Sequence, residues 1–179
     1  SVTVRPPSDR HVGDAVLLAA GCWTPELLSK FSVDLPVYPR KGEMLRLKAP
    51  ELTEYPPVRR GERFVLPRGE DVLVGSTVTE ETNPSTRVSA LRDLLDSAVD
   101  LVPSLDDAHF EETWSGLRPY ADMKGGPFLG AVPESTNVYF AAGHYKTGVL
   151  QGPYTGKLMA DYISGRDPDI DVTRYGPDR

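Results

Sequence analysis

Hydrophobic and polar positions change their spacing several times along the chain, so several kinds of element are predicted. Residues 15–20 (AVLLAA) form a continuous apolar run, which is typical of a buried strand, with a parallel arrangement as one option. Thr24, Pro25 and Glu26 follow at once, and these residue types favour the start of a helix. The pattern therefore predicts a strand and then a short helix over residues 25–31.

The stretch from residue 37 to residue 76 is rich in short apolar runs that predict strands. Two of these runs, 64–66 and 72–75, flank a turn at residues 68–71. Such an arrangement predicts an antiparallel hairpin.

Residues 88–102 have the clearest helical period, and Pro103 ends the predicted helix. Their apolar stripe consists of Val88, Leu91, Leu95, Ala98 and Val102.

The last third of the chain returns to strands and then a helix. Residues 109–117 predict a strand with Phe110 and Trp114 in the core, and residues 137–142 (NVYFAA) predict a buried strand. A final helix is predicted from residue 152 or 153 to residue 163, with Gly165 after its end. Adjoining strands with one long inserted helix indicate an α+β fold. The two ends of the chain are expected to form one layered unit, and the middle a separate antiparallel sheet.

Composition narrows the class of protein. The 179 residues suffice for one domain, or for two small ones that share a core. A net charge of −6 argues against non-specific nucleic-acid binding, because little would neutralise the phosphates.

The single cysteine, Cys22, excludes a disulfide within the chain and favours a reducing compartment. The longest apolar run is well short of the ~20 residues of a membrane span. No signal-peptide core is visible, so a cytoplasmic protein without a membrane span is expected.

Several familiar catalytic and binding motifs are absent. The sequence has no G-x-G-x-x-G, no H-E-x-x-H and no G-x-S-x-G, and residues 152–157 (GPYTGK) fall short of a phosphate-binding loop. The three histidines are far apart, so no metal site is predicted.

Residues 143–148 (GHYKTG) lie between a predicted buried strand and a predicted helix. Backbone N–H groups converge at such a junction, which suits an anion or an electron-rich oxygen. The same pattern is also typical of an ordinary strand-to-helix connection.

Arg118 stands near the end of a predicted strand, in the segment 114–119 (WSGLRP), where Pro119 is expected to end regular pairing. An arginine there could hold a carboxylate through two parallel hydrogen bonds. A surface ion pair is the alternative.

Together these segments resemble the FAD-dependent D-amino-acid oxidase family, and within it the glycine oxidases of thiamine biosynthesis. The resemblance covers nearly the whole chain. The motifs that carry it, in order, are residues 16–23, 39–43, 64–68, 74–77, 114–119, 127–130 and 143–150.

This resemblance implies FAD as the cofactor and assigns two groups of residues. Arg118 would bind the substrate carboxylate, with Lys146 assisting and Phe64 close to the substrate. No residue is nominated as a catalytic base, because an amine that arrives neutral needs none. The residues implied in cofactor binding are Gly21, Cys22, Trp23, His144, Tyr145, Lys146, Thr147, Gly148, Val149 and Leu150.

The resemblance also implies a division of the chain and some departures from the family. Residues 1–34 and 119–179 would be segments of a Rossmann-like FAD domain, and residues 35–118 a substrate domain with an antiparallel or mixed sheet. The family's N-terminal half, which carries the dinucleotide loop, is absent from the sequence. Lys146 replaces an arginine, Phe64 replaces a tyrosine, and residues 122–127 form a longer turn than usual.

The function implied is oxidative deamination of a small amino acid or amine, with an imine or keto acid and hydrogen peroxide as products. The expected partners are that substrate and either the absent FAD-binding half or a second copy of the chain. The alternatives are a partner-dependent half of a split flavoenzyme, a non-catalytic relative, and a relative of the D-amino-acid dehydrogenases or sarcosine oxidases.

Overall fold

The computed structural model describes residues 2–4, 9–122 and 126–178, which divide into two compact units. One unit contains residues 1–39 and 118–179, and the other contains residues 40–117. Two long strands, β4 (Val37–Lys48) and β8 (His109–Ala121), contribute residues to both units. The assignment of chain segments to an FAD domain and a substrate domain stays a prediction.

The first unit is built around a three-stranded mixed sheet. β3 (Val16–Leu18) runs parallel to the central β10 (Val138–Ala142), and β9 (Phe128–Ala131) is antiparallel to β10 on the other side. A separate hairpin pairs β1 (Val2–Val4) with β2 (His11–Gly13).

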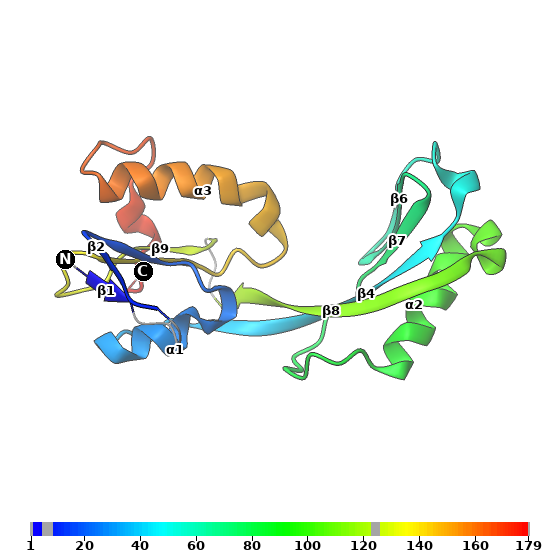
Figure 1. Cartoon of the computed structure of the whole chain (residues 1–179), viewed down its shortest axis with the longest axis horizontal. Helices are drawn as coiled ribbons and strands as arrows, with labels where there is room; N and C mark the ends of the chain where they lie inside the picture. Colours follow the sequence, from blue (N-terminus) through cyan, green and yellow to red (C-terminus); the bar gives the residue numbers. More distant parts are fainter. Residues whose placement is uncertain (1, 5–8, 123–125, 179) are drawn as a thin grey trace. The chain divides into compact units, whose positions relative to one another are not determined.

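Helices cover both faces of the three-stranded sheet (Figure 1). α3 (Gly148–Ile163) lies on one face, where Leu158 and Met159 pack with Leu129 and Ala141. The opposite face packs against α1 (Thr24–Leu28) and the segment that follows it. Side chains alternate along β10, because successive residues of a strand point to opposite faces. Short 3₁₀ turns are η1 (Gly21–Trp23), η2 (Ser29–Phe31), η5 (Tyr145–Thr147) and η6 (Val172–Tyr175).

Three predictions for this unit need correction. The strand over 15–20 is shorter than predicted and is not buried, because β3 is an edge strand and Leu17 is exposed. The helix predicted over 25–31 ends as α1 at Leu28 and continues only as a 3₁₀ turn. The last helix begins at Gly148, not at residue 152 or 153, so Pro153 lies inside the helix, where it removes one backbone hydrogen bond.

The second unit is a five-stranded sheet with one helix on one face. The strand order is β5 (Val58–Arg60), β6 (Arg63–Arg68), β7 (Asp71–Gly75), β4 and β8. The predicted hairpin is confirmed, since β6 and β7 pair antiparallel with Arg68 opposite Asp71. α2 (Val88–Leu101) packs on the sheet through Leu94 and Ala98, with the 3₁₀ turns η3 (Pro50–Leu52) and η4 (Pro103–Asp107) beside it.

The predicted apolar stripe of α2 is partly wrong. Leu94 and Ala90 are fully buried, whereas Val88 is 75% exposed. Val88 is the first helical residue and lies before the helix reaches the sheet, so the periodic pattern extended one turn too far. Phe110 was also wrong as a core residue, because it lies on the edge strand β8 and is 50% exposed.

β8 also corrects the expectation that Pro119 ends regular pairing. The strand continues to Ala121, so Arg118 lies inside it. An edge strand tolerates proline because the missing N–H can fall on the unpaired side. The antiparallel and mixed sheets with few helices confirm the α+β class. None of the helices in the described ranges is long and apolar enough to cross a membrane.

Candidate functional site

The loop that follows β10 is shaped by a glycine that no other residue could replace without strain. Gly143 has a φ of +88°, and a Cβ placed on it would lie 2.8 Å from the Cβ of Ala121. The next residue, His144, forms an antiparallel bridge with Tyr120 at the end of β8. The junction predicted over 143–148 is therefore a tight turn fixed to a neighbouring strand.

The turn itself contains an uncommon backbone conformation. The Thr147 N–H donates to the His144 carbonyl oxygen at 3.1 Å, which closes the turn. Tyr145, at the second position, has a φ of 51°. A left-handed conformation in a bulky residue costs roughly 1–3 kcal/mol, so the surroundings must hold it in place.

The first turn of α3 has no side-chain cap. Thr147 is the N-cap residue, but its hydroxyl donates to the His144 carbonyl oxygen at 2.8 Å and lies 3.0 Å from Gln151 Oε1. The N–H groups at a helix start have no partner within the helix, and together they carry a partial positive charge. This end of α3 thus favours an electron-rich group.

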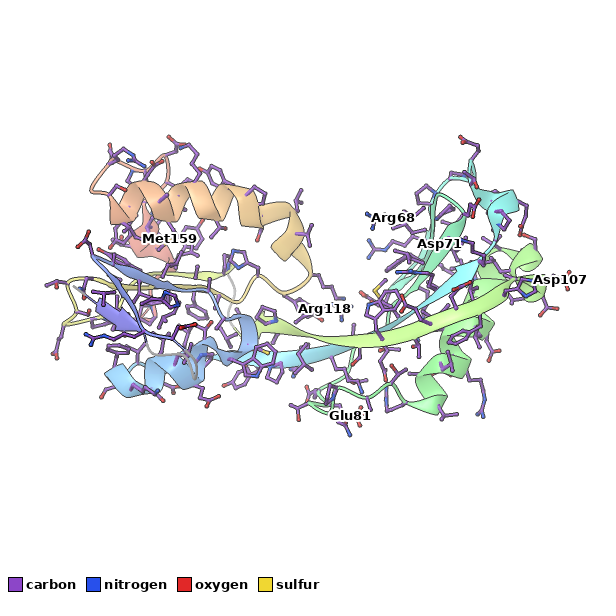
Figure 2. All side chains as sticks on the ribbon, in the orientation of Figure 1. Arg68, Asp71, Glu81, Asp107, Arg118 and Met159 are labelled. Carbon is purple, nitrogen blue, oxygen red and sulfur yellow. The ribbon has the colours of Figure 1, made fainter. Side chains whose placement is uncertain are left out.

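A cavity of about 300 Å³ lies between α3, the sheet and η1, and we call it the helix–sheet cavity. Its wall is mainly apolar, with His144 and Thr155 as polar groups. The lining residues are Leu17, Ala19, Gly21, Pro119, Ala141, Ala142, His144, Tyr145, Gly148, Gly152, Thr155, Gly156 and Met159. Figure 2 shows Met159 directed from α3 towards the sheet.

Glycines make the wall of this cavity flat. Gly148, Gly152 and Gly156 recur every four residues and therefore lie along one side of α3. A Cβ added at Gly21, Gly152 or Gly156 would meet no atom within 4 Å. The backbone is therefore open to close approach by a planar group.

His144 is an ionisable residue that lines the helix–sheet cavity. Its Nε2 lies 2.9 Å from Thr155 Oγ1, which links the turn to the second turn of α3. Burial lowers the pKa of His144 below its ordinary value, so the neutral ring is favoured.

Tyr145 is held on two sides. Its ring meets the Tyr120 ring edge to face, with centroids 5.1 Å apart and planes at 75°. The Lys146 Nζ lies 5.2 Å from the centre of the Tyr145 ring, within the range of a cation–π contact.

Of the remaining residues of the predicted cofactor group, only some line the helix–sheet cavity. Gly21 lines the helix–sheet cavity, whereas Cys22 and Trp23 do not line it, although they share the turn η1. Burial raises the pKa of the Cys22 thiol. Val149 and Leu150, on the first turn of α3, are 96% and 82% exposed.

The predicted substrate residues fall in both units. Arg118, labelled in Figure 2, lies on β8 next to Pro119, which lines the helix–sheet cavity. Phe64 lies on β6 of the other unit, and its ring covers Gly75 on the neighbouring strand β7. The roles of these residues stay predictions.

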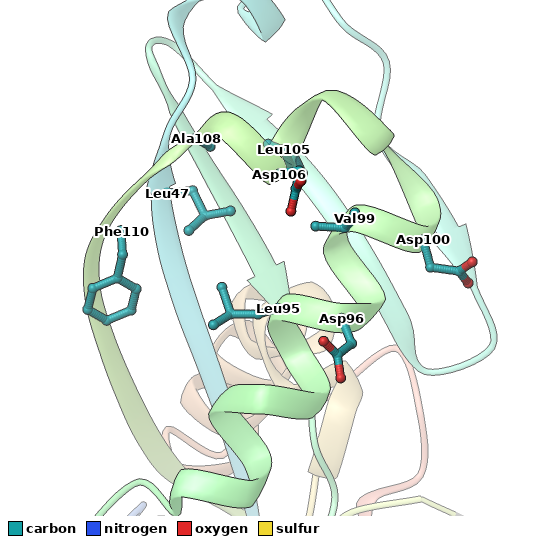
Figure 3. Close-up of a pocket in the computed structure, with 9 residues that line it drawn as sticks. All are labelled: Leu47, Leu95, Asp96, Val99, Asp100, Leu105, Asp106, Ala108 and Phe110. Carbon is teal, nitrogen blue, oxygen red and sulfur yellow. The ribbon is translucent and has the colours of Figure 1, made fainter.

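A second hollow lies in the unit formed by residues 40–117, beside α2 (Figure 3). It has a volume of about 550 Å³, an apolar floor that includes Leu47 and Leu95, and carboxylates at Asp96 and Asp106. None of the residues predicted from the sequence to bind cofactor or substrate lines it. Within residues 2–4, 9–122 and 126–178, no three histidine, cysteine or acidic side chains cluster as a metal site would require.

Sequence reasoning missed several residues of the helix–sheet cavity. The glycine spacing 148–152–156 was visible in the sequence and could have indicated an open helix face. The hydrogen bond between His144 and Thr155 had no signal, because the two residues meet only once the helix is known to begin at Gly148. The longer turn expected at 122–127 includes residues 123–125, which lie outside the described ranges.

Comparison with known proteins identifies the class. Residues 2–162 match the family of FAD dependent oxidoreductases. The chain therefore belongs to this family, which uses FAD as its cofactor.

The relatives are more specific. Over 168 residues the chain is 38% identical to a glycine oxidase of Pseudomonas aeruginosa, covering 92% of this chain and 46% of the relative. The crystal structure of glycine oxidase from Geobacillus kaustophilus superposes with a TM-score of 0.87 at 31% identity, covering 95% of this chain and 46% of that one. An iminodiacetate oxidase from Chelativorans sp. BNC1 superposes with a TM-score of 0.86 at 25% identity, with 94% and 47% covered. The chain thus spans about half the length of the relatives it matches.

The helix–sheet cavity fits part of an FAD molecule. Its glycine-lined wall leaves room for a flat ring, and the uncapped start of α3 offers N–H groups to ring oxygens. Gly21, His144, Tyr145 and Gly148 are the residues of the predicted cofactor group that line this wall.

Proposed function

We propose that this chain provides the substrate-binding part and the flavin-facing wall of an enzyme that oxidises a small amino acid or amine, with glycine as the leading substrate. The observation that carries the proposal is the helix–sheet cavity at the uncapped start of α3, in a chain of the FAD dependent oxidoreductase family. Similarity to glycine oxidases supports the choice of substrate.

The chemistry that FAD supplies when bound is acceptance of a hydride from the α-carbon of the amine, which leaves an imine for water to hydrolyse and passes the electrons to oxygen as hydrogen peroxide. The protein's own contribution is orientation and charge. Arg118 holds the substrate carboxylate through its planar guanidinium, and Lys146 adds positive charge. The start of α3 stabilises negative charge at the oxygens of the ring.

His144 stays neutral in this proposal and does not transfer a proton to or from the substrate. Its bond to Thr155 fixes the ring against α3, so the wall of the cavity keeps its shape. Because the amine is bound in its neutral form, no side chain of the chain acts as a base.

N-substituted glycines are the second candidate substrates. Similarity to an iminodiacetate oxidase supports them, because that protein's name indicates a secondary amine with two carboxylates. Phe64 offers an apolar ring instead of a hydroxyl, which suits a substituent on nitrogen.

A further part of the proposal concerns partners and location. Val149 and Leu150 are apolar and almost fully exposed, and burial of such side chains is favourable. We propose that the polypeptide carrying the dinucleotide loop covers them, with a second copy of the chain as the alternative, in the cytoplasm. Co-purification with a polypeptide that contains G-x-G-x-x-G supports the first choice, and a stable homo-oligomer supports the second.

The experiment is a flavin spectrum and a peroxide assay on the protein isolated with any polypeptide that accompanies it. Glycine, sarcosine, iminodiacetate and D-amino acids are compared as substrates. Arg118→Ala is expected to raise KM at least tenfold, because a charge-assisted hydrogen bond contributes about 1.5–3 kcal/mol. Arg118→Lys should recover only part of the loss.

Arg174→Ala is the matched control, since Arg174 is an exposed arginine of the same unit that pairs with Asp171. An unchanged KM in Arg118→Ala would contradict the role of Arg118. A preparation that binds no flavin at saturating FAD would contradict the proposed function.

A further inference from the structure

Tyr145 occupies a backbone position that ordinarily belongs to glycine or asparagine. It is the second residue of the turn closed by Thr147 and His144, and its φ is 51°. Turns with a positive φ at this position strongly favour glycine, asparagine or aspartate. A bulky residue persists there only where its surroundings determine its conformation, and such residues cluster at functional sites.

The surroundings of Tyr145 include Tyr120, Lys146 and the backbone bridge to β8. The Tyr120 ring meets the Tyr145 ring edge to face at 5.1 Å, and Lys146 Nζ lies 5.2 Å from the Tyr145 ring centre. The backbone of Tyr120 bridges that of His144, the residue before Tyr145. Backbone and side chain therefore fix the same turn against the same strand.

This ring pair is not part of the buried core. Tyr120 and Tyr145 are half-buried, and neither belongs to the apolar clusters beneath the sheet. Both line a small hollow of about 190 Å³ beside Gln151, and Tyr145 also lines the helix–sheet cavity. The two rings therefore line the candidate site and are not part of the apolar core beneath the sheet.

We propose that the Tyr120–Tyr145 ring pair is a positioning device, which fixes the His144–Thr147 turn and so holds the first turn of α3 in the orientation that receives the flavin ring. α3 begins at Gly148, directly after this turn, so a change in the turn reorients its first N–H groups. The flavin part of this inference rests on the proposed function. Tyr120 and Tyr145 act through the backbone and are not catalytic residues.

The chain offers a matched control in a second ring pair of the same unit. Tyr139 and Tyr162 also meet edge to face, with centroids 5.9 Å apart and planes at 85°. They pack beside the buried cluster formed by Leu129, Leu158 and Met159 and line neither cavity. Tyr162→Leu therefore removes an equivalent ring contact away from the turn.

The first measurement is amide hydrogen exchange over residues 145–151 without added flavin, followed by FAD titration and the absorption spectrum of the bound flavin. Tyr120→Leu is expected to speed exchange in this segment about tenfold, weaken FAD binding by a similar factor and change the fine structure of the flavin band. Tyr120→Phe keeps the ring and should change all three measurements less than Tyr120→Leu does. Tyr145→Asn, which tolerates a positive φ but lacks the ring, should behave like Tyr120→Leu even if that variant folds poorly.

The outcomes separate the two proposals. Faster exchange and an altered flavin spectrum in Tyr120→Leu, with smaller changes in Tyr120→Phe and parental behaviour in Tyr162→Leu, support the inference. Parental exchange in both Tyr120→Leu and Tyr145→Asn overturns it, and so does faster exchange with an unchanged flavin spectrum and affinity. A parent protein that binds no FAD overturns the proposed function and with it the flavin part, while the exchange rates still decide whether the rings hold the turn.

Discussion

Lys41 and Glu43 lie two residues apart on β4, both side chains are fully buried, and Lys41 Nζ is 3.4 Å from Glu43 Oε1. Two residues apart in a strand means one face, so both point to the same side of the sheet. Lys41 also donates to the Ser85 carbonyl oxygen at 2.5 Å and to Glu81 at 3.3 Å. The buried lysine thereby ties the segment after β7 to β4.

The Glu43 carboxylate accepts more hydrogen bonds than the Lys41 ammonium group donates. The backbone N–H of Arg87 donates to Glu43 Oε1 at 2.9 Å, and the Arg87 guanidinium donates to Oε2 at 3.1 Å. The Thr77 hydroxyl donates to Oε2 at 2.8 Å and accepts from the Glu43 N–H at 2.9 Å. The carboxylate thus joins β4 to the start of α2.

Glu43→Ala is expected to destabilise the protein by about 3–5 kcal/mol, because it removes the fully buried carboxylate that pairs with the buried Lys41. Lys41→Met should cost less, since Arg87 still pairs with the Glu43 carboxylate. Urea unfolding measures both variants. Glu70→Ala is the control, because Glu70 forms only an exposed pair with Lys48 and should change stability by less than about 1 kcal/mol. Equal effects of Glu43→Ala and Glu70→Ala would contradict the role of this network.

The same carboxylate predicts a pH dependence. Burial raises the pKa of Glu43, but hydrogen bonds from Arg87 and Thr77 outweigh it and lower the pKa to about 2 from 4.5. A lowered pKa in the folded state stabilises the protein above pH 4.5, and this contribution is lost as the pH falls towards 2. Glu43→Gln should therefore be less stable than the parent at neutral pH by roughly 3 kcal/mol, with the difference shrinking through that window. A difference that stays constant down to pH 2 would contradict the prediction.

How far the sequence predicted this fold can be seen at the hairpin and at α2. The hairpin was predicted correctly, because two short apolar runs flank a short polar turn, and this pattern lies within neighbouring residues of the chain. The face of α2 was predicted less well, since the stripe included Val88 and omitted Leu94. Which residues of a helix are buried depends on where the helix meets the sheet, and a periodic pattern does not contain that position.

The candidate site was likewise predicted only in part. The glycine-bounded junction at 143–148 was predicted from residue types, because glycine marks backbone conformations that other residues avoid. The ring contact between Tyr120 and Tyr145 was not predictable, because it joins two segments that meet only through the bridge between Tyr120 and His144. Contacts of this kind depend on tertiary register, which short motifs do not encode.

Gly75→Ala is expected to strain the sheet of the second unit. Phe64, Gly75 and Met44 lie opposite one another on three neighbouring strands. A Cβ on Gly75 would lie 2.5 Å from Cζ of Phe64 and 3.3 Å from the terminal carbon of Met44. Overpacking of this kind costs about 1–3 kcal/mol. The cost should appear as a lower midpoint in urea unfolding.

Two further variants identify the cause of that cost. Gly116→Ala adds the same methyl group on β8, where a Cβ would meet nothing within 4 Å, so it should be nearly neutral. Phe64→Val combined with Gly75→Ala should recover part of the loss, because the smaller side chain leaves space for the added carbon. A double variant whose losses simply add would show that the Phe64 ring is not what excludes a side chain at position 75.

His144 predicts a second and separate pH effect. Burial lowers the pKa of His144 below 6.5, so the unfolded chain binds its proton more readily than the folded protein does. The stability that this histidine contributes is therefore complete above pH 6.5 and is lost as the pH falls through the lower folded pKa. His144→Asn cannot titrate but can still bond to the Thr155 hydroxyl. Between pH 8 and pH 5 the parent should therefore lose more stability in urea unfolding than His144→Asn does.

Thr155→Val separates the hydrogen bond from the titration, because it should lower stability already at pH 8, where the imidazole is neutral in both states. Parallel decline of the parent and His144→Asn would mean that the proton on His144 does not affect the folding equilibrium.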